Sequence, residues 1–323
     1  MSDLKVETVR IGTMRKHENA DSLSVVKVFD YPVVVRTEDY KEGDIAIYVP
    51  VDSMVDTTRP EFSFLHNGKQ MERIRAKKLR GIFSMGLLVK CNAVAVEGED
   101  WTGALGITKY EEPEPMVEDA EKDPGFMPRY TNIQSIRRYN NVILPGEEVV
   151  MTEKIHGANG RWAFARDRFW AGSHNGWKKP GTNSMWWKAS DFFLERLKNI
   201  PNIVMFGEVY GQVQDLRYGM NDGFTVRFFD AFDIEKGKYL DWKDFEELCL
   251  KNDLIMVPIL YRGPYNPELL ARAEEDSALC AGQIREGLVI RPMVERYNEE
   301  CGRVCLKYVS QRYMLRKGGT ERH

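Results

Sequence analysis

The chain has 323 residues, which is enough for two domains that each bury a core of their own. Its formal net charge is -3 and its pI is about 6.1, which argues against a protein that coats nucleic acid by bulk charge but does not exclude a local basic groove. The N-terminal stretch MSDLKVETVR contains no apolar signal core, and no apolar run reaches ~18 residues. We therefore expect a soluble, cytoplasmic protein with no membrane partner.

The first part of the chain, residues 1–110, has the pattern of a small β domain. The runs SVVKVF, YPVVVR and DIAIYVPV are rich in β-branched and aromatic residues, and turn-forming clusters such as YKEGD separate them. Closely spaced short strands are typical of a small barrel or sandwich. Residues 111–128 are acidic, contain prolines and are poor in branched apolar residues, so we expect a linker there.

Residues 129–323 mix helix and strand patterns. A helix is predicted within 183–200, because the apolar residues of NSMWWKASDFFLERLKNI recur with helical spacing. Asp241 is a candidate N-cap for a helix over 241–252, and Asn266 before Pro267 indicates another helix start. Strand-like runs are NIVMFGEVYG, FTVRFFDAFDI, GLVIRP and VCLKYVS. This mixture predicts an α+β domain with an antiparallel core.

Four charged residues stand in or beside strand-like runs of the second domain: Lys154, Glu208, Glu286 and Lys307. One such lysine is usually a solvated strand end, but four positions in one domain favour a shared site. A lysine is a nucleophile only when neutral, and its ordinary pKa is ~10.4. Burial or a second cation such as Lys307 lowers that pKa. Glu286 suits a divalent metal, so the set fits attack of the Lys154 amine on a nucleoside triphosphate.

These runs also resemble a known family. EKIHGANG resembles motif I of the covalent nucleotidyltransferases, the superfamily of polynucleotide ligases and mRNA capping enzymes, and its KxHGxN form is similar to that of nick-sealing phage RNA ligase. FGEVYG, FFDAFDI, REGLVIRP and RVCLKYVS resemble motifs III, IIIa, IV and V, in that order, across about 129–313. One motif alone would be weak, whereas five in order are specific.

The resemblance implies ATP as the nucleotide, a divalent metal (Mg²⁺ or Mn²⁺) and a role for each motif residue. Lys154 would be the nucleophile, Glu286 the metal-linked carboxylate and Lys307 the triphosphate contact. The remaining implied roles are adenine contact by Glu153, metal hydration or ribose contact by Asn159, ribose contact by Glu208 and base stacking by Phe232. His156 is interpreted either as orienting the motif I loop or as a packed loop histidine.

Two positions depart from the family pattern. The second lysine of a Lys-x-Lys motif V is replaced by Val309, so another cation, for which Arg312 is the candidate, would have to contact the phosphates. In WAGSHNGWKK, Ser173 and His174 stand where relatives often carry an arginine, which puts the ribose and RNA contacts of that region in question.

The first domain resembles oligonucleotide-binding (OB) folds through RKHENADSLSVVKVFDY, residues 15–31. Residues 73–80 carry five cations that would attract a phosphate backbone. The alternative interpretation is a strand or loop face that is merely solvated. These cations are Arg73, Arg75, Lys77, Lys78 and Arg80. An OB fold before motif I, with ten residues after Tyr313, resembles an ATP-dependent RNA ligase family rather than capping enzymes or most DNA ligases.

We therefore predict an N-terminal OB-fold β-barrel at 1–110, a linker at 111–128 and an adenylyltransferase domain at 129–323, which is ATP-grasp-like and has antiparallel sheets. The expected function is sealing of 3′-OH and 5′-phosphate RNA ends, at nicks in duplexes, by a monomer through lysyl-AMP and RNA-adenylate. The rival interpretations are a DNA ligase or guanylyltransferase, and a non-catalytic RNA-binding protein with a relic nucleotidyltransferase domain.

Overall fold

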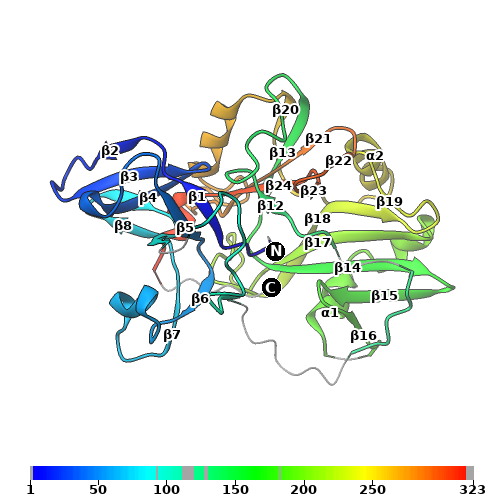
Figure 1. Ribbon diagram of the computed structural model, residues 1–323. Helices are drawn as coiled ribbons and strands as arrows, with labels where there is room; N and C mark the ends of the chain where they lie inside the picture. Colours follow the sequence, from blue (N-terminus) through cyan, green and yellow to red (C-terminus); the bar gives the residue numbers. More distant parts are fainter. Residues whose placement is uncertain (1–2, 92–93, 111–119, 127–129, 182, 318–323) are drawn as a thin grey trace. The chain divides into compact units, whose positions relative to one another are not determined.

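The fold is taken from a computed structural model, which describes residues 3–91, 94–110, 120–126, 130–181 and 183–317. The chain divides into two compact units (Figure 1). Unit 1 comprises Met1–Glu111 with Gln134–Asn140, and unit 2 comprises Glu112–Ile133 with Asn141–His323. None of the helices in the described ranges is both long and apolar enough to cross a membrane.

Unit 1 consists of short antiparallel ladders. Two three-stranded sheets order β1 (Glu7–Arg10), β5 (Ile45–Val49), β10 (Leu87–Lys90) and β2 (Met14–Lys16), β3 (Leu23–Val28), β4 (Tyr31–Arg36). Smaller ladders join β11 (Thr108–Lys109), β6 (Ser53–Asp56), β7 (Met71–Arg73) and pair β8 (Lys77–Leu79) with β9 (Ile82–Ser84). The unit also contains η1 (Thr37–Asp39), η2 (Pro60–Leu65) and β12 (Gln134–Ser135).

Alternating β-branched residues build the core of unit 1. In the β3–β4 hairpin Val26 lies opposite Val33, and both are buried because every second residue points inward. A second cluster gathers around Phe62 and Ile47. The predicted β-rich first domain is therefore present, and its described strands form separate ladders that do not close into a cylinder.

Unit 2 contains two antiparallel sheets. The six-stranded sheet orders β16 (Trp177–Lys178), β15 (Arg168–Ser173), β14 (Ala158–Ala165), β17 (Ile203–Gly211), β18 (Phe224–Asp233) and β19 (Lys238–Tyr239). The second sheet orders β24 (Leu306–Val309), β21 (Gly287–Pro292), β13 (Glu148–Lys154) and β20 (Ile259–Pro264) within this unit. A hairpin of β22 (Tyr297–Asn298) and β23 (Gly302–Arg303) lies between β21 and β24 in the chain.

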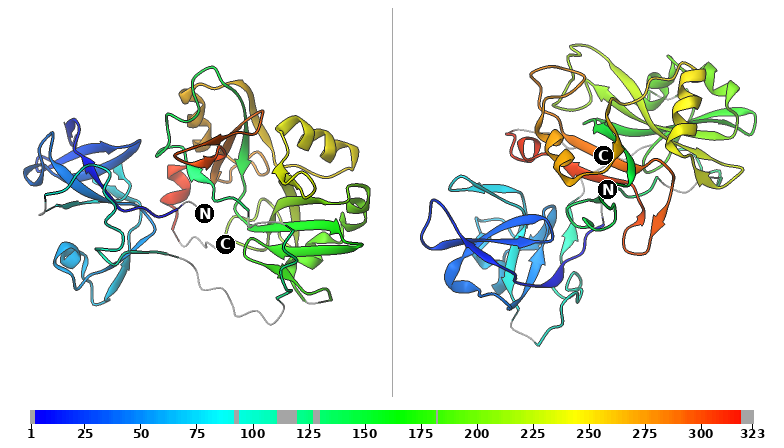
Figure 2. Two further views of the ribbon diagram at one scale, coloured as in Figure 1. Left: turned by 45° about the vertical axis from the view of Figure 1, so that its right-hand side comes forward. Right: turned by 90° about the horizontal axis from the view of Figure 1, so that it is seen from above.

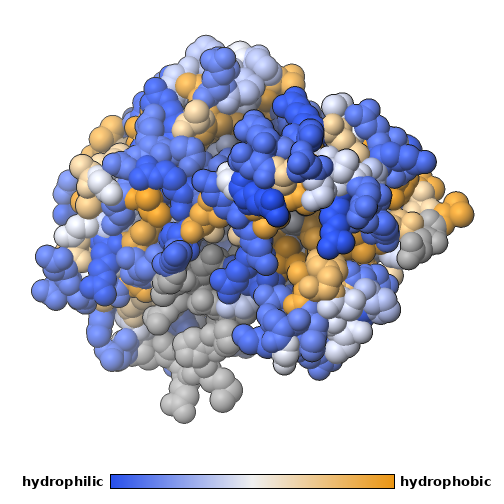
Figure 3. All heavy atoms as spheres, turned by 90° about the vertical axis from the view of Figure 1, so that its left-hand side faces the viewer, coloured by the Kyte–Doolittle hydropathy of each residue, from blue (hydrophilic) through white to orange (hydrophobic). Residues whose placement is uncertain are grey.

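Short helices connect and cover these sheets: α1 (Met185–Ser190), η3 (Leu194–Asn199), α2 (Trp242–Lys251), η4 (Pro267–Glu274) and α3 (Gln311–Met314). α2 packs through Trp242 and Phe245 on one face of the six-stranded sheet, as Figure 2 shows in yellow. Figure 3 shows a face on which hydrophilic side chains predominate and apolar ones are scattered, as is usual for a surface in contact with water.

Two helices differ in detail from those predicted from the sequence. The stretch 183–200 forms α1 and then the 3₁₀ helix η3, because the Ser190 hydroxyl donates to the Trp187 carbonyl oxygen (2.6 Å) and the backbone of Phe193 is not helical. Its apolar face is nevertheless buried as expected. Asp241 precedes α2, but its carboxylate accepts from the Glu295 N–H (2.7 Å) rather than capping the helix. Asn266 does cap η4, by accepting from the Glu268 N–H at 3.0 Å.

The predicted linker is described only in part, since residues 111–119 and 127–128 lie outside the described residues. Within 120–126, the Glu121 N–H donates to the Trp177 carbonyl oxygen (2.8 Å), and the Phe126 ring packs edge-on against Trp170. These contacts attach the segment to β15 and β16 of unit 2.

Candidate active site

The register of the second sheet sets which motif residues share a face. Lys154 at the end of β13 lies opposite Gly287 on β21, and two residues away Val289 lies opposite Lys307 on β24. Directly opposed residues point to the same side of a sheet, and side chains alternate along each strand. Lys154 and Lys307 therefore lie on one face of the sheet.

Glu286 pairs with the lysine of motif I. It immediately precedes β21, it is 6% exposed, and its Oε1 lies 2.6 Å from the Lys154 Nζ. Its second oxygen, Oε2, is buried and accepts no hydrogen bond from the described residues. A buried carboxylate oxygen without a hydrogen-bond partner destabilises the folded state, so a ligand that binds this oxygen would remove that cost.

Asn159 and Glu208 come from the other sheet, where they lie opposite each other on β14 and β17. Glu208 Oε1 accepts a hydrogen bond from the Gly157 N–H at 3.1 Å. A Cβ on Gly157 would stand 2.1 Å from the Val209 carbonyl oxygen, so only glycine allows this approach of motif I to β17. The strand pairing thus brings motifs I and III together.

Glu208 occupies an environment that disfavours its charged form. Burial raises the pKa of its carboxyl to about 8, with a further rise from Glu286, while Lys154 and the Gly157 N–H act in the opposite direction. Glu208 is therefore mostly protonated at neutral pH. A protonated carboxyl can accept a hydrogen bond with one oxygen and donate one with the other, which suits a hydroxyl-bearing ligand.

The site fits a divalent cation that keeps most of its own water. Within the described ranges, no three His, Cys, Asp or Glu side chains form a metal cage. Two buried oxygens at the site nevertheless have no hydrogen-bond partner among those residues, Glu286 Oε2 and Asn159 Oδ1. Mg²⁺ and similar ions are commonly held by one or two such oxygens together with substrate phosphates. The donor set therefore agrees with the predicted metal role of both residues.

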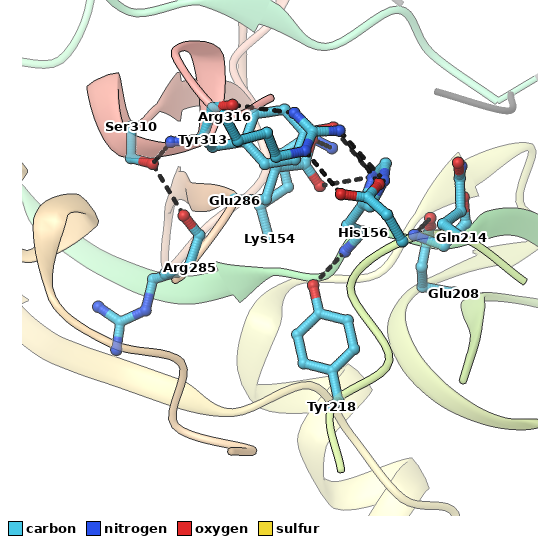
Figure 4. Close-up of polar contacts among 12 residues, drawn as sticks. Lys154, His156, Glu208, Gln214, Tyr218, Arg285, Glu286, Ser310, Tyr313 and Arg316 are labelled. Carbon is cyan, nitrogen blue, oxygen red and sulfur yellow. Dashed lines mark hydrogen bonds and ion pairs between the residues drawn. The ribbon is translucent and has the colours of Figure 1, made fainter. Parts of the chain in front are cut away.

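Both ring nitrogens and the backbone N–H of His156 have polar partners (Figure 4). Its backbone N–H donates to the Tyr218 hydroxyl at 2.6 Å. Its Nε2 lies 2.8 Å from the Asp215 Oδ1, and its Nδ1 lies 3.0 Å from the Tyr313 hydroxyl. The Nδ1 is also 3.9 Å from Glu286 Oε2. The interpretation of His156 as the residue that orients the motif I loop agrees with these contacts, since the ring lies at the site and bridges separate segments.

Phe232 is not brought to this cluster. It is 6% exposed, lies opposite Val204 and packs edge-on against Tyr239. A register shift between Phe206 and Gly207 disturbs the alternation of β18. The partly buried Phe229 packs both against the cluster that contains Phe232 and against apolar residues near His156. The latter are Ile155, Tyr210, Leu216, Tyr218, Val257 and Tyr313. Phe229 is thus the aromatic that the structure offers for a base.

Glu153 faces away from Lys154, because adjacent residues of β13 point to opposite sides of the sheet. Its carboxylate is 1% exposed, accepts from the Ala278 N–H (2.8 Å) and the Ser277 hydroxyl, and lies near Arg285. Burial raises the pKa of this carboxyl, and its hydrogen bonds with Ser277 and Ala278 oppose that rise. In this structure its side chain anchors the 275–285 loop, on the opposite side of β13 from Lys154.

Arg312, the candidate for the phosphate contact that Val309 cannot make, binds acidic and carbonyl oxygens at the end of η4. It bonds Asp276 Oδ1 and the Glu274 carbonyl oxygen, both at 2.9 Å. Arg316 instead bonds Asp215 and places its Nη2 3.4 Å from His156 Nε2. No periodic pattern in the sequence points to Arg316, which follows the short helix α3.

The region resembling motif Ia forms a tight turn. The Ser173 hydroxyl accepts from the Asn175 N–H at 3.2 Å and the Gly176 N–H at 3.3 Å, between β15 and β16. Its role here is therefore to shape the turn. On the neighbouring β14, Arg161 is 2% exposed and stacks on Trp177 at 4.2 Å.

The predicted basic segment of unit 1 contains one partly buried member and four exposed ones. Arg73 bonds Asp52 (2.6 Å) and stacks on Tyr110 at 3.9 Å. The exposed cations form no ion pair with described residues. They are Arg75, Lys77, Lys78 and Arg80. Arg80 and Gly81 have φ values of 46° and 95°, so a two-residue turn with positive φ joins β8 and β9 and presents Lys77, Lys78 and Arg80 on this hairpin.

Comparisons with known proteins agree with this architecture. The RNA ligase family matches residues 147–309, and an OB-fold domain family matches residues 6–91. The chain therefore belongs to the RNA ligase family, and the predicted order of an OB-fold domain followed by a nucleotidyltransferase domain is confirmed. No curated protein matches the chain.

Three solved structures of Naegleria gruberi RNA ligase share the fold. A lysine-to-alanine variant with ATP and Mn is 23% identical with a TM-score of 0.82, over 96% of this chain and 98% of that chain. An aspartate-to-alanine variant without ligand is 23% identical with a TM-score of 0.83, over 97% and 98%. A glutamate-to-alanine variant with AMP and Mn is 23% identical with a TM-score of 0.82, over 97% and 98%.

Proposed function

We propose that this RNA ligase family member uses ATP to join 3′-OH and 5′-phosphate RNA ends, preferably at nicks in a duplex. The observation that carries the proposal is the Lys154 amine held 2.6 Å from Glu286 on the sheet face that also bears Lys307. An amine between a carboxylate and a second cation suits phosphoryl-group chemistry better than a solvated strand end does.

In the first step the Lys154 Nζ attacks the α-phosphorus of ATP. A P–N bond forms, the bond to the bridging oxygen breaks, and pyrophosphate leaves. The amine must shed a proton, and Glu286 Oε1, 2.6 Å away, can accept it. Lys307 offsets the negative charge of the triphosphate from the same face.

A divalent cation would be held by Glu286 Oε2 and Asn159 Oδ1, two buried oxygens of the motif residues that have no hydrogen-bond partner among the described residues. When bound, it supplies positive charge against the phosphate oxygens. The presence of Mn with ATP or AMP in the Naegleria gruberi structures supports this proposal.

Nucleoside binding is assigned to the six-stranded sheet. Protonated Glu208 accepts from Gly157 and can donate to a ribose hydroxyl, and Phe229 offers its ring to the base. Phe229 replaces Phe232 in this proposal because the latter is packed against Tyr239. Stacking on one aromatic ring contributes about 1–3 kcal/mol per base.

The later steps transfer AMP. An oxygen of the RNA 5′-phosphate attacks the phosphorus of lysyl-AMP, the P–N bond breaks, and Lys154 recovers its proton as it leaves. A 3′-OH then attacks the activated 5′-phosphate, a phosphodiester forms, and AMP departs. Positioning and charge stabilisation supply much of the rate increase in such transfers, so no dedicated base is required for the last step.

RNA binding is assigned to the exposed cations at 75–80 of unit 1. The protein is proposed to act as a monomer that contains both units. The division into 1–110, 111–128 and 129–323 belongs to the same proposal. Residues 134–140 group with unit 1, so the nucleotidyltransferase region includes a short segment that packs with the first domain.

The test has two parts. Incubation with ATP or GTP and Mg²⁺ or Mn²⁺, followed by intact-mass measurement, should show a gain of one AMP and none of GMP. Nicked duplexes whose 3′-OH strand ends in ribonucleotides should then be sealed faster than all-DNA nicks, because the 2′-OH distinguishes the strands. Preference for GTP would indicate a guanylyltransferase, and equal sealing of DNA a DNA ligase. Absence of any mass gain would indicate a non-catalytic RNA-binding protein.

A further inference from the structure

The side chains that enclose His156 come from segments outside the recognised motifs. Asp215 lies in the loop after β17, Tyr313 belongs to α3, and Arg316 follows that helix. The imidazole ring is 5% exposed. Figure 4 shows Tyr313 and Arg316 beside the histidine, close to Lys154 and Glu286.

Asp215 and Arg316 form a two-point ion pair next to the ring. The Arg316 Nε donates to Asp215 Oδ2 at 2.9 Å, and its Nη2 donates to Oδ1 at 3.3 Å. Arg316 is fixed in turn, because its Nη1 donates to the Tyr313 carbonyl oxygen (2.9 Å) and its guanidinium stacks on the Tyr313 ring (3.5 Å). Both Asp215 oxygens therefore accept hydrogen bonds from the Arg316 guanidinium, as those of a carboxylate in an ion pair do.

These partners determine where the imidazole proton resides. The Asp215 carboxylate at 2.8 Å favours a hydrogen on His156 Nε2, and this contact is shorter than the 3.4 Å approach of the Arg316 Nη2 donor to the same nitrogen. The Tyr313 hydroxyl at 3.0 Å then donates to the Nδ1 lone pair. The alternative tautomer would place a hydrogen on Nδ1, which is 3.9 Å from Glu286 Oε2 and could form a bond after a small shift. Such a bond would occupy the Glu286 oxygen that otherwise has no described partner.

We propose that Asp215 and Arg316 are positioning residues that fix His156 in its Nε2–H tautomer and thereby keep the Glu286 carboxylate available beside Lys154. The inference rests on the proposed function, since it concerns the geometry of lysine adenylylation. It also explains how segments with no motif contribute to the site, because orientation of a histidine by a carboxylate is a general way to select its tautomer.

The experiment compares Asp215→Ala, Asp215→Asn and Arg316→Ala in the full chain. Glu246→Ala and Arg262→Ala are matched controls, because they remove the members of another ion pair of unit 2. Long-range ¹H–¹⁵N NMR reads the tautomer of His156, whose signals are assigned by their loss in His156→Asn. Single-turnover adenylylation at varied ATP concentration separates the maximal rate from the apparent affinity.

We expect the wild type to show the Nε2–H pattern and Asp215→Ala to lose it. Its maximal adenylylation rate should fall about 10–100-fold, the range seen when an orienting partner is removed, with the apparent ATP affinity within about threefold. Arg316→Ala should give a smaller loss. Asp215→Asn should retain the pattern and recover most of the rate, because an amide oxygen can still accept from Nε2–H. Both controls should stay within about twofold.

Three results would overturn the inference: an unchanged rate in Asp215→Ala, an Nδ1–H pattern in the wild type, or an equal loss in the matched controls. If the wild type gains no AMP, the proposed function itself fails, and the tautomer measurement still decides whether Asp215 orients His156. The two failures are therefore distinguishable.

Discussion

The two units present their charged residues in opposite ways. In unit 2 the site residues are buried or closely partnered, as the contact of Lys154 with Glu286 and the enclosure of His156 show. In unit 1 the hairpin cations Lys77, Lys78 and Arg80 are exposed and form no ion pair within the described residues.

The difference follows from what each kind of site must do. Covalent chemistry requires reacting atoms at fixed distances, so its groups are held by strands and by one another. Attraction of a polyanion acts over about 10 Å at moderate salt and needs exposed, mobile cations instead. Substitutions in the two units should therefore differ both in size and in kind.

The largest effect is expected for Lys154→Ala. Removal of the only proposed nucleophile leaves no atom that can form the P–N bond, so intact-mass measurement after incubation with ATP and metal should show no AMP. Lys251→Ala, at an exposed i,i+4 pair with Glu247 on α2, is the control and should be adenylylated normally. Adenylylation of Lys154→Ala to the wild-type extent would show that another residue is the nucleophile.

A smaller but still severe loss is expected for Glu286→Ala and for Lys307→Ala. Glu286→Ala removes an oxygen proposed to hold the metal cation, and Lys307→Ala removes a positive charge proposed to act on the phosphates. Loss of such a stabilising group costs ~3–4 kcal/mol, or on the order of a hundredfold or more in rate. Single-turnover adenylylation measures this effect. A rate within threefold of the wild type in either variant would contradict the role of that residue.

The charged motif residues could be predicted because each stands in or beside a strand whose pattern is visible in the sequence. Alternation within each strand is visible in the sequence, whereas the common face of Lys154 and Lys307 also depends on the register of β13 and β24 with β21. The family resemblance then supplied their chemistry. The same alternation could also have shown that the Glu153 side chain faces the opposite side from its neighbour.

Other site residues could not be predicted because local irregularity or distant folding decides them. Phe229 replaces Phe232 through a register shift, which no hydrophobic period reveals. Asp215 and Arg316 lie 101 residues apart in the chain, and only the closure of unit 2 brings them together. A loop aspartate and an arginine after a short helix are ordinary surface residues in any sequence pattern.

Substitution of Lys77, Lys78 and Arg80 by alanine should weaken RNA binding without affecting lysine adenylylation. Each phosphate that the protein no longer neutralises reduces the log–log salt slope of binding by ~0.7–0.9, so the triple variant should bind with a slope lower by about 2. Titration of RNA at several salt concentrations measures it. The control replaces Lys16, Lys27 and Lys90, which are paired with acidic residues. An equal change of the salt slope in both triple variants would contradict the assignment of RNA binding to the β8–β9 hairpin.

The smallest expected effect concerns Glu208 and the dependence of stability on pH. Its pKa is about 8 in the folded chain, because burial disfavours the carboxylate, against ~4.3 for an ordinary glutamate. Between these two values the folded state keeps a proton that the unfolded state has lost. The stability linked to Glu208 is therefore fully present below ~4.3 and is lost as the pH rises through about 8.

The glutamine in Glu208→Gln does not titrate, so the unfolding free energy of this variant should not fall in this pH range for that reason. With allowance for the partial exposure of the side chain, we expect a gain over the wild type on the order of 2 kcal/mol in unfolding free energy as the pH rises from about 5 to about 9. Thermal and denaturant unfolding without nucleotide, at several pH values, measure the difference. Glu268→Gln, which makes the same chemical change at an exposed position of η4, should instead follow the wild type. Parallel curves for Glu208→Gln and the wild type would show that Glu208 is ionised in the folded site, and the donor role toward a ribose hydroxyl would then be wrong.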